Sequence, residues 1–255
     1  MNKWLGLSLL MLSPVAVGDK NSAIDFYSAS NQSVDIIGEA FSLKNDRLLY
    51  REYHQFNGNQ HVVIYKDRDG REFSRKTVDY SISQQAPSFT QHNQWSGETI
   101  AVDYHAGTIS LNYRNSRDNT DISEQLTSNK TLIIDAGFNR YIQNNWQALL
   151  DGKSTVFDFA LADRQDLIAL EIARSDCKKR LTNTTSAADK VCFSIGANNR
   201  LIRWLIGSLD LVYAKDTKQL LRFTGLANIN DQQGAGLKVD IHYYYPPADR
   251  LANDG

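Results

Sequence analysis

Short apolar runs separated by tight-turn dipeptides fill the first half of the chain, and this pattern restricts the fold more than any other. Asn57-Gly58 and Asp69-Gly70 each lie between runs rich in β-branched and aromatic residues. Asn-Gly and Asp-Gly readily adopt the positive φ that two-residue hairpin turns require. Strands are expected at residues 34–43, 47–56, 61–66, 72–83, 99–105 and 108–114. Joined by such turns, these strands form an antiparallel meander.

The second half of the chain contains further strand patterns. Apolar residues alternate through 155–161, whereas 167–173 is mostly apolar on both faces and is expected to be a central strand. Strands are also expected at 209–214, 219–227 and 237–245. In the last of these, Leu237, Val239 and Ile241 face one side of the sheet. Residues 198–206 fit either a short helix or a buried strand.

One helix is expected, from about Ala136 to Leu150, because apolar residues recur there at helical spacing. Asp135 is the expected N-cap, and Gly152 is expected to end the helix. The aromatic stripe of this helix is expected to pack on the concave face of the sheet. The alternative is that it lines a ligand cavity, whose candidate residues are Tyr141, Trp146, Phe157 and Phe159.

These patterns predict a mainly β fold of the α+β class. The expected architecture is a curved antiparallel sheet or a partly closed barrel, with one amphipathic helix packed on it. Residues 115–130 contain almost no apolar side chain. They are expected to form an exposed loop within a single domain, 19–255, because no boundary rich in Pro, Gly or Ser is present. A linker between two domains is the alternative.

The first eighteen residues have the layout of a secretory signal peptide. Lys3 precedes an apolar run from Trp4 to Leu12, and Ala16 and Gly18 are small residues at the expected cleavage spacing. Ser13-Pro14 interrupts the apolar run too early for a membrane-spanning helix, which needs about 20 apolar residues. The sequence therefore predicts export with cleavage near Gly18, and an uncleaved membrane anchor is the weaker alternative.

Cys177 and Cys192 are the chain's two cysteines, and export favours a disulfide between them because oxidising compartments keep thiols paired. A redox pair usually has Cys-x-x-Cys spacing, which is absent. The five histidines are scattered, without the spacing of a metal site. No metal site and no cofactor are predicted.

Catalytic motifs are also absent from the sequence. There is no Gly-x-Ser-x-Gly, and the many acidic residues cannot be paired from sequence alone. Asp67-Arg-Asp69-Gly70 does not match a calcium loop and is better explained as a hairpin turn. The formal net charge of −1 provides no argument for binding nucleic acid. No catalytic residue is predicted.

Two basic segments are candidates for contact with an anion or with lipid headgroups. The cysteine loop carries three adjacent cations, and a later apolar run places two arginines beside a tryptophan. The alternatives are a solvated loop and a buried element whose arginines pair with carboxylates. The candidate residues are Lys178, Lys179, Arg180, Arg200, Arg203 and Trp204.

Three C-terminal segments resemble the C-terminal hairpins of uncharacterised exported β-rich proteins of Gram-negative bacteria. They are Leu209-Asp-Leu-Val-Tyr213, residues 220–229 and residues 236–245. The resemblance implies a periplasmic location and no known activity.

The first functional hypothesis is a non-enzymatic periplasmic binding or envelope-maintenance protein that holds a lipid or another apolar ligand. A curved sheet with a helix across it encloses a cavity of the kind that ligands occupy. The second hypothesis is an interaction module that contacts an envelope protein through a strand edge or the basic loop. The third is a hydrolase without a visible motif. The sequence makes no prediction of oligomeric state.

Overall fold

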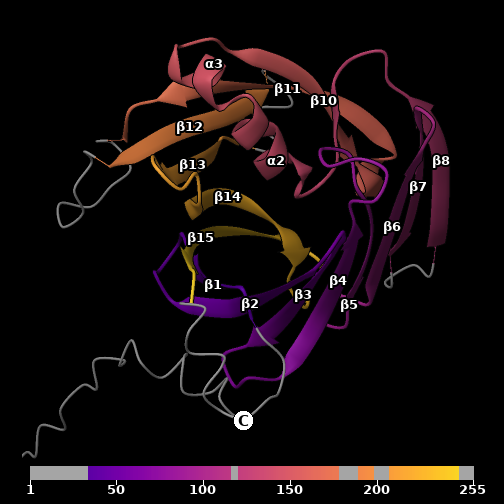
Figure 1. The fold of residues 1–255 in the computed structure, drawn as a ribbon. Helices are drawn as coiled ribbons and strands as arrows, with labels where there is room; N and C mark the ends of the chain where they lie inside the picture. Colours follow the sequence, from indigo (N-terminus) through magenta and orange to yellow (C-terminus); the bar gives the residue numbers. More distant parts are fainter. Residues whose placement is uncertain (1–33, 116–119, 178–188, 198–206, 247–255) are drawn as a thin grey trace, which may run out of the picture. The chain divides into compact units, whose positions relative to one another are not determined.

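The computed structural model describes residues 34–115, 120–177, 189–197 and 207–246. Residues 34–247 belong to one compact unit. Its described residues form a single sheet of fifteen strands, which confirms the predicted mainly β fold with a curved, unclosed sheet (Figure 1).

The first and last strands in the sequence lie side by side at the centre of the sheet. β1 (Ile36–Ser42) pairs with β15 (Gly236–Tyr244) on one side and with β2 (Leu48–Asn57) on the other. A first arm runs outward from β1 in chain order to β8, and its further strands are β3 (Gln60–Asp67), β4 (Glu72–Asp79), β5 (Ser88–Asn93), β6 (Glu98–His105), β7 (Thr108–Asn115) and β8 (Thr120–Thr127).

A second arm runs from β15 back along the chain to β9 at the opposite edge. Its further strands are β14 (Leu220–Asn230), β13 (Leu209–Ala214), β12 (Lys190–Ala197), β11 (Asp166–Ser175), β10 (Thr155–Leu161) and β9 (Leu132–Ile133). All strand pairs are antiparallel except β9 and β10. The meander expected for the first half of the chain is therefore present, and the second arm repeats this arrangement from β10 to β15.

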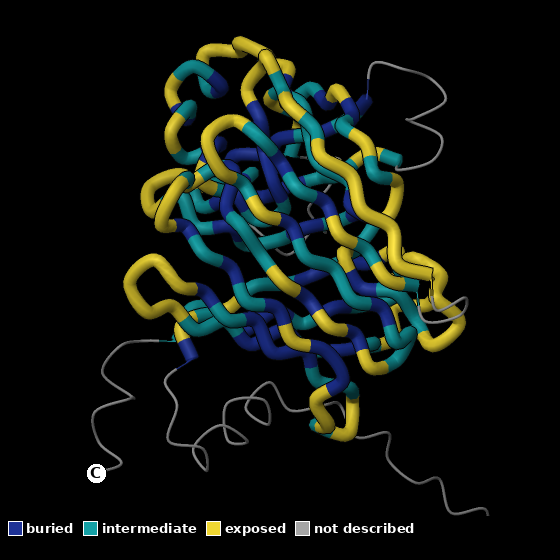
Figure 2. The backbone as a smooth tube through the Cα atoms, turned by 90° about the vertical axis from the view of Figure 1, so that its right-hand side faces the viewer, coloured by how far each residue is buried: buried dark blue, intermediate teal, exposed yellow. Residues whose placement is uncertain are grey.

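The two arms meet through side chains, without a ladder between β8 and β9 in the described part of the sheet. Val102, Ile109 and Leu111 of the first arm form an apolar cluster with Leu132 and Ile134, which belong to the start of the second. The Ile134 amide also donates to the Gln85 carbonyl oxygen at 3.1 Å. Side-chain packing and this hydrogen bond thus join the two arms where no β8–β9 ladder does. Buried positions recur along the strands on this side (Figure 2).

The predicted helix is two short helices. α2 (Gly137–Asn144) and α3 (Trp146–Leu150) are separated at Asn145, whose φ of −101° and ψ of 16° are not helical. The Asn145 side-chain amide donates to the Tyr141 carbonyl oxygen at 2.8 Å, which stabilises the break. Asp135 is not the N-cap: the cap residue is Ala136, and the Asp135 carboxylate is bound elsewhere.

Four strands lie where the sequence pattern did not predict them, and one of these, β9, has only two residues. β8 lies within residues 115–130, which were expected to form a loop, and nearly all of its residues are exposed, so no buried face marks it. β5 turns Gln91 and Asn93 toward the interior, where an apolar residue is the usual signal. β12 begins two residues before Cys192, in a segment assigned to the cysteine loop.

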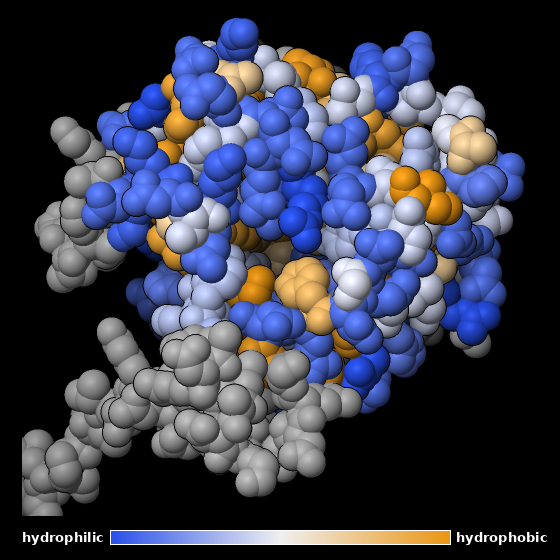
Figure 3. Space-filling view, in the orientation of Figure 1, coloured by the Kyte–Doolittle hydropathy of each residue, from blue (hydrophilic) through white to orange (hydrophobic). Residues whose placement is uncertain are grey.

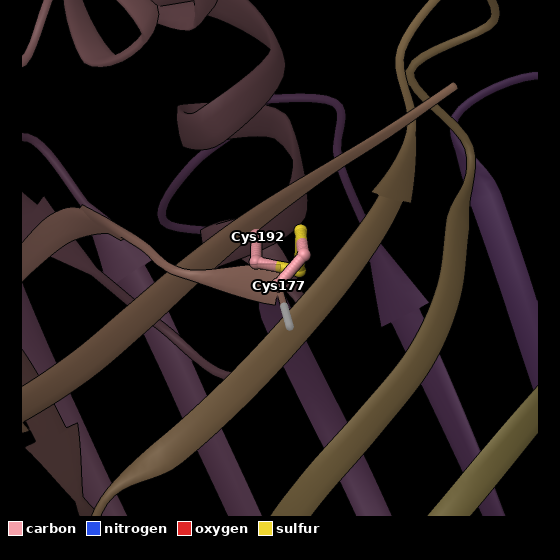
Figure 4. Close-up of a disulfide and its surroundings, with 2 residues drawn as sticks. All are labelled: Cys177 and Cys192. Carbon is pink, nitrogen blue, oxygen red and sulfur yellow. A yellow bond between two sulfur atoms is a disulfide. The ribbon is translucent and has the colours of Figure 1, made fainter. Parts of the chain in front are cut away.

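The predicted disulfide is confirmed, with the Cα atoms of Cys177 and Cys192 5.3 Å apart (Figure 4). Cys192 lies on β12, and its register partner is Ser175 at the end of β11, two residues before Cys177. The bridge therefore joins two neighbouring strands. A bridge spanning 15 residues is expected to stabilise the fold by about 3 kcal/mol in the chain-entropy model.

Candidate functional site

Hairpin turns from both arms surround a cleft, here called the hairpin cleft, with a volume of about 690 Å³. In an antiparallel meander every second turn lies at the same end of the sheet. The turns after β1, β3 and β5 share one end for this reason. The turn after β14 lies at the same end because β15 runs antiparallel to β1. Each of these four turns contributes residues to the cleft. Figure 3 shows one face of the molecule, on which hydrophobic side chains are visible around a central recess in a mostly polar surface.

The apolar wall of the hairpin cleft consists of Leu48, Leu49, Phe73 and Trp95. The rings of Phe73 and Trp95 stack, with centroids 3.5 Å apart and an interplanar angle of 7°. A register shift between Tyr65 and Lys66 marks an irregularity where β3 pairs with the start of β4, next to Phe73. Since Leu49 and Trp95 also pack against the main core, this wall is continuous with the interior.

The charged rim contains three carboxylates, and each is already bound within the β3–β4 hairpin. Asp67 accepts from the Asp69 and Arg71 amides at 2.9 Å and from the Arg71 side chain at 3.1 Å. Arg71 also donates to Asp69 at 2.9 Å, and Arg75 donates to Glu72 at 2.8 Å. These bonds fix the turn and engage all three carboxylates, with Arg71 shared between Asp67 and Asp69.

The other two charged residues of the rim are Arg47 and Arg68. Both are exposed, and no ion pair joins either guanidinium to a carboxylate in the described part of the chain. The hairpin cleft therefore presents two cations without acidic partners beside an apolar wall.

A chain of hydrogen-bonded polar groups lies inside the sheet. The Tyr243 hydroxyl donates to Glu52 at 3.2 Å, and the same Glu52 oxygen is 3.2 Å from His54 Nε2. His54 Nδ1 and His61 Nε2 share a further hydrogen bond of 3.0 Å. A Cβ atom on Gly38 would lie 2.9 Å from the Tyr243 ring and 3.1 Å from Glu52, so this approach requires glycine. We call Glu52, His54, His61 and Tyr243 the inner polar network.

A buried ion pair joins the first arm to the segment that enters α2. Lys76 Nζ lies 2.7 Å from an Asp135 carboxylate oxygen, and the Lys76 side chain is only 2% exposed. Burial alone would raise the pKa of Asp135, but the charge and hydrogen bond of Lys76 hold this pKa below its ordinary value. The Asp135 carboxyl is therefore ionised at neutral pH.

Side-chain amides make a second set of bonds between the arms. Gln91 donates to the Asn228 carbonyl oxygen at 2.8 Å, and Asn93 donates to the Asn230 carbonyl oxygen at 3.0 Å. Asn230 in turn donates to Glu98 at 2.8 Å. The inward polar residues of β5 thus satisfy backbone groups at the end of β14, which explains their burial.

Two members of the inner polar network, His61 and Tyr243, have pKa shifts that favour their neutral forms. Burial, and then the positive charges of His54 and Lys76, lower the pKa of His61 to about 3. Burial, and then the charge of Glu52, raise the pKa of Tyr243 well above its ordinary value. At neutral pH Tyr243 therefore stays protonated, and its hydroxyl donates a hydrogen bond to Glu52. It is not activated as a nucleophile.

The aromatic residues predicted to line a cavity lie in the core. Tyr141, Trp146 and Phe157 are buried, and Phe159 is half-buried against them. The Tyr141 and Phe157 rings have centroids 5.6 Å apart, and Trp146 makes an edge contact with Phe193 at 5.5 Å. These rings pack between helix and sheet, and their contact with a ligand stays a prediction.

The basic candidates from the sequence lie outside the described residues. They are Lys178, Lys179, Arg180, Arg200, Arg203 and Trp204. The described ranges contain no group of three His, Cys, Asp or Glu side chains suited to a metal ion. Nor does any helix in those ranges have the length and apolar character to cross a membrane.

Sequence reasoning missed Arg47, Arg68 and Trp95 as residues of one site. The available signal was their position, since each lies in or next to a turn. These three turns are every second turn of the meander, so they lie at the same end of the sheet. Lys76 had a weaker signal, since it falls between Ser74 and Val78 on the inward face of β4. A lysine on that face requires a buried partner, but nothing local identifies Asp135.

The lowered pKa of His61 predicts acid sensitivity. The unfolded state takes up a proton as the pH falls below about 6.5, whereas the folded state resists protonation until about pH 3. This difference lowers the free energy of unfolding by about 1.4 kcal/mol per pH unit within that window. Between pH 7.5 and 4.5 the wild type should lose about 2–3 kcal/mol more than His61→Gln, measured by urea unfolding. Parallel stability curves for the two proteins would contradict this role.

No family model matches the chain, and no curated protein matches it. Among solved structures, the chain is similar to a β-barrel-like protein of a domain of unknown function, DUF1849, from Brucella abortus. The match covers 85% of this chain and 99% of that chain, with 9% sequence identity and a TM-score of 0.42.

Proposed function

We propose that the protein is a non-enzymatic binding protein of the periplasm, which holds a lipid or another apolar ligand in the hairpin cleft. The observation that carries this proposal is the combination of an apolar wall and a charged rim around about 690 Å³. Ligand pockets usually have about 300–1,000 Å³ and are mainly apolar with a few placed polar groups. The cleft has a volume within this range, and its polar and charged lining surrounds one apolar wall, so it suits a ligand with both a polar and an apolar part.

Two further features support a periplasmic location. Residues 1–18 have the pattern of a signal peptide, although they lie outside the described residues. The Cys177–Cys192 disulfide suits an oxidising compartment.

The hairpin cleft replaces the space between helix and sheet as the proposed ligand site. The aromatic side chains of α2 and α3 pack against the sheet in that space, as the contacts of Trp146 illustrate. In the hairpin cleft, by contrast, the stacked pair of Phe73 and Trp95 borders an open volume. A ligand can therefore enter without displacing the core.

An interaction module of the cell envelope is the second candidate function. β8 pairs with β7 alone among the strands of the described sheet and is therefore an edge strand. Such an edge can accept an added strand from another protein. A mature protein that binds no apolar probe but captures one envelope protein would favour this candidate.

A neutral apolar dye tests ligand binding directly. The mature protein should enhance the fluorescence of N-phenyl-1-naphthylamine, and Trp95→Ala should weaken binding about tenfold because it removes half of the stacked pair in the wall. Ile82→Ala is a matched control, since Ile82 is 59% exposed and does not line the cleft. Equal binding by Trp95→Ala and wild type, or no dye binding at all, would contradict the proposal.

A further inference from the structure

We propose that the ligand of the hairpin cleft is an anionic amphiphile, with its acidic headgroup held by Arg47 and Arg68 and its apolar part on the wall. This inference rests on the proposed function, because it specifies the chemistry of the same site. It concerns the headgroup, whereas the binding proposal concerns only the apolar part.

The charges of the rim carry the inference. All of its carboxylates are bound by amides or arginines of the β3–β4 hairpin itself, as Asp67 is by Arg71. Arg47 and Arg68 have no such ion pair within the described ranges. The formal charges of the lining residues cancel, but the carboxylates already accept hydrogen bonds from their own hairpin, whereas the two arginines have no carboxylate partner within the described ranges.

The chemistry of arginine limits the possible kinds of acidic headgroup. A guanidinium group is planar and more weakly hydrated than an ammonium group, and it binds carboxylates and phosphates through two parallel hydrogen bonds. Arg47 and Arg68 lie on two different hairpins that border one cleft, the turns after β1 and β3. An acidic headgroup between them would be bound from two sides.

The apolar wall requires the rest of the ligand to be apolar. Leu48 and Leu49 follow Arg47 directly in the chain, and all three line the cleft. A free inorganic anion would leave this wall in water, whereas an amphiphile covers the wall and reaches the cations at the same time. The wall and the two arginines together therefore indicate a ligand with an apolar chain and an anionic end.

Four probes with the same fourteen-carbon chain separate headgroup recognition from chain binding. They are tetradecanoate, tetradecyl phosphate, tetradecanol and tetradecyltrimethylammonium, each used below its aggregation concentration to displace N-phenyl-1-naphthylamine from the mature protein. The two anions should bind about tenfold more tightly than the alcohol, and the cation should bind least tightly.

The double variant Arg47→Ala/Arg68→Ala should weaken binding of both anions about tenfold and leave binding of tetradecanol unchanged. Lys153→Ala/Lys215→Ala is the matched control, because it removes the same charge at exposed positions outside the cleft. Binding of all probes with equal affinity, or an unaffected double variant, would overturn the headgroup inference and leave the binding function standing. Binding of none of the probes would overturn both.

Discussion

Lys76→Met is expected to lower the free energy of unfolding by about 3–5 kcal/mol, the usual cost of removing one partner of a buried ion pair. The Lys76 ammonium is buried with Asp135 at 2.7 Å, and the second Asp135 carboxylate oxygen has no hydrogen-bond partner within the described ranges. Without Lys76, the buried carboxylate loses its main compensating charge. It must then take up a proton or draw in water, and both weaken the junction between the arms.

Urea unfolding of four proteins measures this effect: wild type, Lys76→Met, Asp135→Leu and the double variant. The double variant should be more stable than Lys76→Met alone, because it leaves no unpaired charge. Lys44→Met is the control for losing a cation, since Lys44 is exposed in the turn after β1. A loss below about 1 kcal/mol in Lys76→Met would mean that water reaches this pair, as it does at surface ion pairs.

Gly137→Ala is expected to cost about 3 kcal/mol, at the upper end of the usual range for overpacking. A Cβ atom at Gly137 would overlap the Gln85 carbonyl oxygen and lie 2.6 Å from the Gln85 carbonyl carbon. These are backbone atoms, so no side-chain rotation relieves the clash. The same Gln85 oxygen accepts the Ile134 amide, so moving it also disturbs the contact that joins the two arms.

Gly196→Ala is the matched control for this substitution. Gly196 lies on β12, and a Cβ atom added there would meet no other atom within 4 Å. Alanine at this position should therefore be neutral or stabilising by about 0.5–1 kcal/mol. Thermal unfolding compares the two variants, and amide hydrogen exchange at Ile134 reports on the junction itself. Equal stability of the two variants would show that the loop containing Gln85 moves without cost.

The local features of the fold could be predicted from residue patterns. The boundaries of β10 and β13 agree with the predicted strands, because alternating side chains and flanking turn residues are local signals. The disulfide was predictable as well, since the first residues predict export and two cysteines have one possible pairing. The break at Asn145 was not, because the apolar spacing continues through it while the backbone does not.

The hairpin cleft could be identified only from the folded sheet. Its residues come from hairpins far apart in the chain, and Arg47 and Gln232 line it together because β1 and β15 pair. That pairing of the first and last strands has no local signal. The sequence could indicate which turns lie at the same end of each arm, but not that the arms adjoin.

Residue patterns alone specify most of the strands, the turns between them, the disulfide and the inward face of the last strand. These follow from periodicity and from the conformational preferences of single residues, which act over a few positions. The folded sheet, in contrast, was needed to show that Lys76 meets Asp135 and that Gln91 meets Asn228. The curvature of the whole sheet selects such partners, because burial makes a polar group bind whichever complementary group the fold brings within reach.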